Sequence, residues 1–177
     1  FMMGLPTETY DDLDGIADLA RKVVNAYFAV PKDKRAKGFR VTCSASVFVP
    51  KPFTPFQWEK QDSFAELEKK QAHLKSAITD KRIRYNYHDA KVSRIEAALA
   101  RGDRRLGRVI EFMVNDGVML DAWDENFDYD KWISAFERAG IDPDFYTTRG
   151  FALDEVLPWD IIDCGVTKEF LLRERNK

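Results

Sequence analysis

The feature that most constrains this chain is a corner between a short apolar run and an acidic helix start. It reads Phe1-Met2-Met3-Gly4-Leu5-Pro6-Thr7-Glu8-Thr9-Tyr10-Asp11-Asp12-Leu13. Gly4 can adopt backbone angles closed to other residues, and Pro6 fixes φ and cannot donate to a β-ladder, so a strand must end here. Thr9 can cap a helix, with Asp12 in the capping-box position, so a helix must begin here. The sequence therefore predicts a strand, a turn and a helix, and α/β enzymes bind their ligands at such corners.

A second strand is expected after the first helix. Apolar residues at helical spacing predict a helix from about Tyr10 to Phe28, and Phe39 to Val49 alternates between apolar and polar residues as strands do. Strand, helix and strand in this order predict a βαβ unit. The polar side of the second strand carries Thr42, Ser44 and Ser46. These hydroxyls either line an active-site cavity or belong to an edge strand with one face in water, and both interpretations stay open.

A segment with three prolines follows the second strand, between residues 50 and 55. Proline keeps such a segment extended, and in a barrel it lies at the catalytic rim. Lys51, Thr54, Gln57 and Trp58 are therefore candidates to reach a substrate. A rigid loop that only covers the barrel mouth is the alternative, which we favour for the phenylalanines of this segment.

Helical patterns dominate the rest of the chain, apart from Ile83 to Tyr87, which predicts a strand or an extended link. The residues expected to cap or open these helices are Ser63, Asp89, Asp103, Asp128 or a neighbour of it, and Thr167. We expect an α/β fold, with a partial parallel (βα) barrel built on the βαβ unit over residues 1–79. A mostly helical C-terminal extension over residues 80–177 is expected to pack with it as one unit.

Composition and charge argue against several classes of protein. With 28 basic and 30 acidic residues the net charge is −2, so no global field favours nucleic acid or a membrane surface. We find no run of about 18 apolar residues and no secretion signal, and we expect a cytoplasmic protein without a membrane partner. The basic cluster from Lys32 to Lys37 is interpreted as solvated surface, with contact to nucleic acid as the alternative.

Several reactive side chains have two interpretations each. His88 beside Asp89 is either a tuned acid or base or part of a helix start. The arginines of the Arg101–Arg105 segment either hold a phosphate or carboxylate or form salt bridges with nearby acids. Cys43 and Cys164 are too far apart in sequence to form a short metal knuckle, and we interpret them as free thiols.

The opening turn resembles the Gly-Leu/Phe-Pro-Gly-Glu-Thr turn of radical S-adenosylmethionine (radical SAM) enzymes, although Thr7 stands where the commoner turn has glycine. The segments Val47–Trp58 and Arg101–Leu106 add to the likeness. Together they resemble an uncharacterised Fe–S oxidoreductase branch of the family, whose longer members carry a cobalamin-binding-like region before the barrel. The resemblance extends over nearly the whole chain, which corresponds to the C-terminal part of the radical SAM region.

The resemblance implies an oxidoreductase that cleaves S-adenosylmethionine with a four-iron four-sulfur cluster, held by a Cys-x-x-x-Cys-x-x-Cys loop. That loop is not in this sequence, so no metal ligand is assigned and no cofactor is expected on this chain alone. The resemblance also implies that Gly4, Leu5 and Pro6 lie near the adenosyl half of the cofactor, with Glu8 and Thr9 shaping the turn. The resemblance assigns no catalytic residue and no substrate. Cys164 is either an ordinary thiol or an additional cluster ligand or radical relay.

Three residues precede the turn, whereas a strand usually needs about five or six, so we expect a fragment whose main partner is the rest of its own polypeptide. Such a fragment is expected to be inactive by itself. An unpaired barrel edge is also expected to promote homo-oligomers. The alternatives are a non-catalytic module that binds RNA or a protein, and a purely structural domain.

Overall fold

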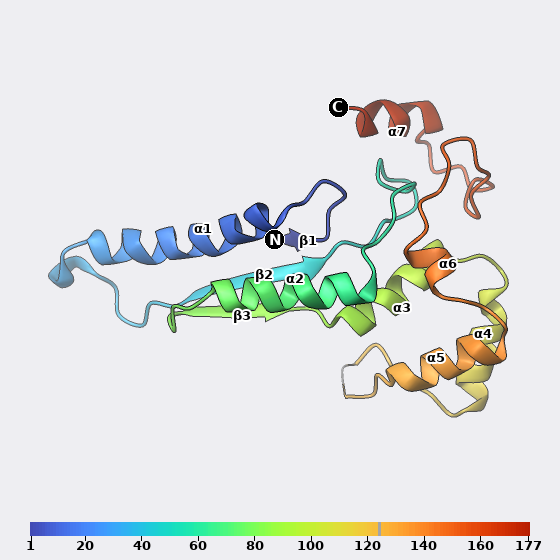
Figure 1. The fold of residues 1–177 in the computed structure, drawn as a ribbon, viewed down its shortest axis with the longest axis horizontal. Coiled ribbons are helices and arrows are strands. Elements are labelled where there is room, and N and C mark those ends of the chain that lie inside the picture. The colour runs from blue at the N-terminus through green and yellow to red at the C-terminus, as the bar shows by residue number, and fades with distance from the viewer. Residues whose placement is uncertain (124) are drawn as a thin grey trace. The chain divides into compact units, whose positions relative to one another are not determined.

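A computed structural model describes residues 1–123 and 125–177 of the chain. The structure is mixed α/β, with a small parallel sheet and several helices (Figure 1). In chain order its elements are β1 (Met2–Met3), α1 (Tyr10–Ala29), the 3₁₀ turn η1 (Lys32–Lys34), β2 (Val41–Val47), α2 (Phe64–Ala77), β3 (Ile83–Tyr87), α3 (Ala90–Arg101), α4 (Leu106–Asn115), α5 (Tyr129–Arg138), α6 (Asp144–Thr147) and α7 (Lys168–Arg175).

The chain divides into two compact units. Unit 1 comprises Phe1–Phe48 and Phe64–Ala90, and unit 2 comprises Val49–Ser63 and Lys91–Lys177. The sequence-based division into residues 1–79 and 80–177 differs from this, because it separates β3 from the sheet with which β3 pairs. It also assigns the proline-rich segment to the barrel, whereas the compact units group that segment with the later helices.

The sheet of unit 1 has the order β1-β2-β3, and both neighbouring pairs are parallel. Met3 is aligned with Val47, and Cys43 is aligned with Tyr85. Because α1 connects β1 to the parallel strand β2, the predicted βαβ unit is confirmed. The segment Ile83–Tyr87, which the sequence left as a strand or an extended link, is the third strand.

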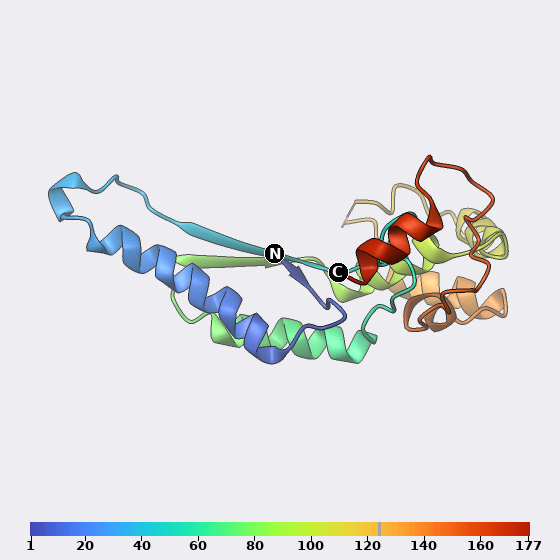
Figure 2. The same ribbon diagram turned by 90° about the horizontal axis from the view of Figure 1, so that it is seen from above.

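Helices α1 and α2 lie on the same side of this sheet (Figure 2). Small and aliphatic side chains make the contact, so that the helices approach the strands closely. The buried residues that meet there are Ala17, Ala20 and Val24 of α1, Leu74 of α2, and Cys43 and Ala45 of β2. Within unit 1, all of whose residues the structure describes, no helix covers the opposite face of the sheet.

The boundaries of α1 agree with the sequence prediction. The Thr9 side chain accepts a hydrogen bond from the backbone N–H of Asp12, and the Asp12 carboxylate accepts one from the N–H of Thr9 at 2.8 Å. This is the expected capping box, which satisfies two backbone donors at the helix start. The helix ends at Ala29, two residues before Pro31.

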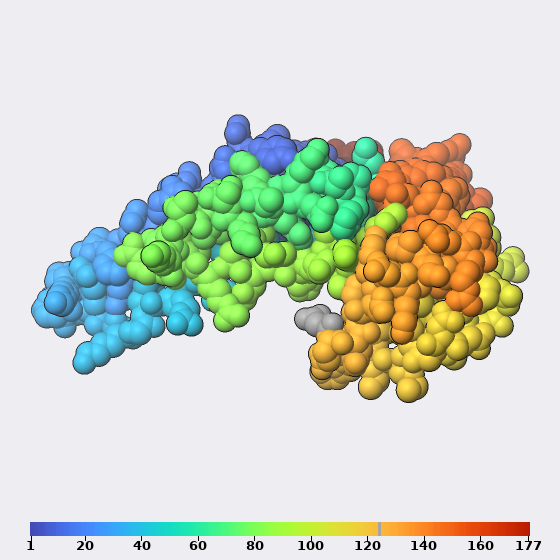
Figure 3. Space-filling model, turned by 60° about the horizontal axis from the view of Figure 1, so that its bottom comes forward, coloured from blue at the N-terminus to red at the C-terminus, as the bar shows by residue number. Residues whose placement is uncertain are grey.

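The described residues of unit 2 are largely helical and form two apolar cores. The first core joins α3, α4, α5 and α6, and α4 and α5 form the adjoining yellow and orange surface in Figure 3. The second core joins the proline-rich segment to the C-terminal part through Trp58, Phe151, Leu157, Trp159 and Leu171. Among the described residues, no helix combines the length and the apolar character needed to cross a bilayer.

The N-caps of unit 2 were predicted with mixed success. Asp128 caps α5 and Thr167 caps α7 through their side chains, as expected. The prediction that Asp103 caps α4 was wrong, because α4 begins at Leu106 and no side chain caps it. The Asp103 carboxylate instead accepts the backbone N–H of Arg105 at 2.9 Å.

Candidate functional site

The Gly4 corner lies directly after β1, at the C-terminal end of that strand. Gly4 has φ +89°, in the region that favours glycine, which explains the residue type at this position. Its backbone N–H donates to Oε2 of Glu8 at 2.8 Å, and the N–H of Glu8 donates to the carbonyl of Leu5 at 3.0 Å. The side chain of Glu8 therefore folds back and closes the turn.

A lysine from α2 completes this corner. Lys70 Nζ lies 3.0 Å from the same Oε2 atom of Glu8, and the two side chains are only 7% and 6% exposed. Sequence reasoning missed Lys70, because it belongs to a charged stretch. The available signal was its position on the apolar stripe of α2, between the buried residues Leu67 and Leu74.

The five residues predicted near the cofactor thus divide into two groups. Glu8 and Thr9 shape the turn, one through the Gly4 N–H and the other through the capping box. Gly4 is buried, Leu5 is half-buried and Pro6 is exposed, so the tip of the turn meets solvent. Contact between this tip and a cofactor stays a prediction.

The open face of the sheet carries the predicted hydroxyl row. Thr42 and Ser44 are exposed and Ser46 is half-buried, because these residues alternate with the buried Cys43, Ala45 and Val47. β2 is the central strand, so the interpretation of this row as part of an edge strand is wrong. The polar face nevertheless meets solvent.

Two residues of β3 extend this polar face. The parallel register places Arg84 beside Thr42 and Asn86 beside Ser44, and Arg84 Nε donates to Asn86 Oδ1 at 3.1 Å. Hydroxyl, guanidinium and amide groups on one face can bind a polar or anionic ligand. The alternation of Ile83, Tyr85 and Tyr87 with polar residues was the signal that could have identified Arg84 and Asn86.

The rim candidates Lys51, Thr54 and Gln57 belong to unit 2. Lys51 forms an exposed ion pair with Glu96, and Thr54 Oγ1 donates to the carbonyl of Lys51 at 2.8 Å. Both residues remain accessible to solvent.

Gln57 and its neighbour Trp58 are buried instead. Gln57 is 3% exposed, and its Oε1 accepts from Trp159 Nε1 at 2.8 Å and from the N–H of Phe53 at 3.1 Å. Trp58 belongs to the second apolar core of unit 2. The contacts of these two residues are therefore with the chain itself, and a substrate contact stays a prediction.

The arginines of the Arg101–Arg105 segment have different environments. Arg101 is 0% exposed, and its Nη1 and Nη2 each donate to a backbone carbonyl at 3.0 Å, those of Thr147 and Arg149. The pKa of Arg101 is lowered to about 10, mainly by burial and to a smaller extent by the positive charge of Arg149. Arg101 therefore stays protonated at neutral pH.

Arg105 forms the salt bridge expected from the sequence. Its Nη2 lies 2.7 Å from Oδ2 of Asp103, and its Nε lies 3.0 Å from both carboxylate oxygens. These hydrogen bonds from Arg105 lower the pKa of Asp103 to about 2. The side chain of Arg104 is exposed and forms no recorded hydrogen bond or ion pair with the residues that the structure describes.

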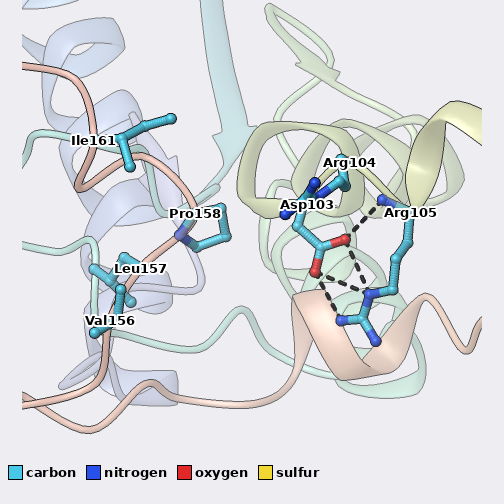
Figure 4. Close-up of a pocket in the computed structure, with 8 residues that line it drawn as sticks. Asp103, Arg104, Arg105, Val156, Leu157, Pro158 and Ile161 are labelled. Carbon is cyan, nitrogen blue, oxygen red and sulfur yellow. Dashed lines mark hydrogen bonds and ion pairs between the residues drawn. The ribbon is translucent and has the colours of Figure 1, made fainter.

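A cavity of 790 Å³ lies beside this segment. Gly102, Asp103, Arg104 and Arg105 form one wall (Figure 4). The other wall comes from the segment between α6 and α7, through Val156, Leu157, Pro158 and Ile161. One wall is therefore charged and the other apolar.

The cysteines and His88 provide no assembled reactive centre. Cys43 is buried in the sheet, where burial raises the pKa of its thiol, and Cys164 is exposed in unit 2. The side chain of His88 precedes α3 on the surface, and its carbonyl accepts from Gln71 Nε2 at 2.7 Å. In the part of the chain that the structure describes, no cluster of three or more His, Cys, Asp or Glu side chains is placed to hold a metal ion.

Comparison with known proteins gives one significant relative among curated proteins. An uncharacterised protein of Methanocaldococcus jannaschii is 29% identical over 141 residues. The match covers 80% of this chain, and the chain spans about 29% of the length of that relative. No protein-family model and no solved structure matches the chain significantly.

Proposed function

We propose that this chain is the late part of the barrel of a radical SAM enzyme. In the longer protein it contributes to the cofactor and substrate site of an Fe–S oxidoreductase. The observation that carries the proposal is the Gly4 corner, which follows a strand of a parallel sheet at its C-terminal end. Ligands of parallel α/β folds bind at that end. The turn sequence, through its resemblance to radical SAM enzymes, then suggests the family.

The finer architecture that we propose is a partial parallel (βα) barrel. Helices α1 and α2 cover one face of the sheet, which is how the helices of such a barrel cover its outside. The hydroxyls of Thr42, Ser44 and Ser46, together with Arg84, then face the barrel interior. The outer edge of β1, which has no strand partner among the described residues, pairs with a preceding strand of the longer polypeptide. The greater length of the archaeal relative is consistent with such a parent protein.

The residues of this chain do not fit a four-iron four-sulfur cluster. Such a cluster needs several thiolates close together, whereas Cys43 is buried in one unit and Cys164 is exposed in the other. We assign the cluster ligands to the remainder of the longer protein. This chain alone is therefore inactive.

The Gly4 corner fits a role in binding the adenosyl half of S-adenosylmethionine. When bound, this cofactor supplies a radical after reductive cleavage. Glu8 and Lys70 hold the turn from its buried side, which leaves the tip at Pro6 open to a ligand. Leu5 and Pro6 then provide an apolar surface, and Gly4 allows the turn that presents them. Lys51, Thr54 and Gln57 remain the rim candidates for substrate contact.

We place the enzyme in the cytoplasm, where free thiols stay reduced. A non-catalytic module that binds RNA or a protein is the competing function. It is favoured by the loop around η1, where Lys32, Lys34 and Lys37 are exposed and form no recorded ion pair within the described chain.

Anaerobic reconstitution of the longer protein with iron and sulfide tests the proposal. We expect a brown chromophore, release of 5′-deoxyadenosine from S-adenosylmethionine after reduction, and a colourless 177-residue chain under the same conditions. A longer protein that stays colourless contradicts the enzyme assignment. The competing function is supported if such a colourless protein retains RNA at low salt. The logarithm of its RNA affinity should then fall linearly with the logarithm of the salt concentration.

A further inference from the structure

The cavity between residues 102–105 and 156–161 lies within unit 2 and has no part in the proposed reaction. Its volume of 790 Å³ is within the range of small-molecule sites, roughly 300–1,000 Å³. The view in Figure 4 shows its two walls facing each other across open space.

The apolar wall exposes hydrophobic surface to water. Val156 is 82% exposed and Ile161 is 90% exposed, whereas Leu157 between them is buried in the second core of unit 2. Single exposed apolar residues are common, but these two line the same cavity. A ligand with an apolar body removes their surface from water, which is favourable.

The opposite wall carries an uncompensated positive charge. Arg105 and Asp103 neutralise each other through their forked hydrogen bonds. This leaves Arg104, whose side chain has no recorded ion-pair partner in the described part of the chain. Such a wall attracts an anion.

We propose that this cavity binds a small amphipathic anion, a short alkyl or aryl chain that ends in a carboxylate or a phosphate. Arg104 holds the anionic end, because a guanidinium can bind either oxyanion with two parallel hydrogen bonds. Val156 and Ile161 cover the apolar body. A neutral hydrocarbon leaves Arg104 without a partner, and a bare anion leaves the apolar wall in water, so the site favours a molecule with both parts.

Titration of the 177-residue chain with four probes tests this proposal, with backbone amide NMR shifts as the readout. The probes are hexanoate, hexyl phosphate, hexan-1-ol and acetate. We expect saturable shifts at residues 102–105 and 156–161 with hexanoate or hexyl phosphate, and the tighter of these two identifies the preferred oxyanion. Hexan-1-ol and acetate should each bind at least about tenfold more weakly, since each lacks one of the two interactions.

Variants at exposed positions then identify the two walls. R104Q should weaken hexanoate binding by about tenfold and leave hexan-1-ol binding unchanged, and R104K should restore part of the loss. I161S should weaken the binding of both hexanoate and hexan-1-ol, because both use the apolar wall. R108Q is the matched control, because Arg108 is an exposed arginine of α4 that pairs with Glu111 and does not line the cavity. Its hexanoate affinity should stay within about twofold of the unsubstituted chain.

Three results would overturn the proposal. They are the absence of saturable shifts at the two walls, equal affinity for hexanoate and hexan-1-ol, and equal loss of affinity in R104Q and R108Q. Because the measurement needs neither cluster nor S-adenosylmethionine, its outcome is independent of the radical SAM assignment.

Discussion

Oε2 of Glu8 and Nζ of Lys70 lie 3.0 Å apart in the interior of unit 1, where both side chains are almost fully buried. The same oxygen accepts the backbone N–H of Gly4. One carboxylate therefore ties the turn after β1 to helix α2. The geometry of the corner depends on an ion pair between residues that are far apart in sequence.

Replacement of Lys70 by methionine should destabilise the fold strongly. The change leaves the Glu8 carboxylate buried without its cation, so K70M should lower the free energy of unfolding by about 3 kcal/mol. Urea unfolding followed by circular dichroism measures this. Lys69 is the control, since it is 71% exposed in a loose pair with Glu66, and K69M should change stability by less than about 0.5 kcal/mol. Equal effects of the two substitutions would show that the buried pair has no special role.

Replacement of two glycines by alanine should change the stability of the chain in opposite directions. Gly4 has φ +89°, so G4A forces a side chain into strained backbone geometry and should cost about 1–2 kcal/mol. Gly15 lies inside α1, and a Cβ added there would meet no other atom within 4 Å, so G15A should stabilise the chain by about 0.5–1 kcal/mol. Thermal melts of both variants provide the measurement. A G4A variant as stable as the parent chain argues against the described turn.

The two thiols should differ greatly in reactivity. Cys43 is 2% exposed and burial raises its pKa, so little reactive thiolate forms near neutral pH, whereas Cys164 is exposed. A thiol reagent should modify one cysteine in the native chain and both after unfolding. Mass spectrometry locates the modified residue, and C164S should abolish the rapid phase. Rapid native labelling of Cys43 is inconsistent with a sheet face covered by α1.

Stability should fall at low pH in part because of Asp103. Its pKa is about 2 in the folded state, below its ordinary value of 3.8, so the folded state binds fewer protons in this range. The stabilisation is therefore complete above about pH 4 and is lost as the pH falls through 2. D103N should flatten the pH dependence of the unfolding free energy between these limits, relative to the unsubstituted chain. If the unfolding free energy of D103N depends on pH as it does in the unsubstituted chain, the ion pair between Asp103 and Arg105 does not affect stability.

The chain should self-associate through the outer edge of β1. That edge has no strand partner among the described residues, and unpaired edges promote pairing with another copy. Sedimentation velocity at increasing protein concentration should show a shift towards larger species. Monomeric behaviour over the whole range contradicts this prediction.

Local features were predictable because their causes are local. The Thr9 capping box, the length of α1 and the alternation in β2 each depend on residues close together in sequence. The parallel βαβ order also followed from a connection of helical length between two strands. The prediction that Asp103 caps α4 failed because α4 begins three residues further on, at Leu106. A sequence pattern does not show that the Asp103 carboxylate accepts both the backbone N–H and the guanidinium of Arg105.

The details of the candidate sites depend on long-range contacts and were not predictable. Nothing near Glu8 indicates that its ion-pair partner lies on α2, and nothing near Gln57 indicates that its oxygen accepts from Trp159. Thr42 and Ser44 were correctly placed on a polar face, but Arg84 joins them only through the register between β2 and β3. The cavity likewise combines two segments that are well separated along the chain.

An experimental structure of the longer protein tests the central claim most directly. Our account predicts that β1 gains a parallel strand on its outer edge and that Thr42, Ser44 and Ser46 face the inside of a closed or partial barrel. A structure in which β1 remains an edge strand, or in which the hydroxyl row faces bulk solvent, would contradict it.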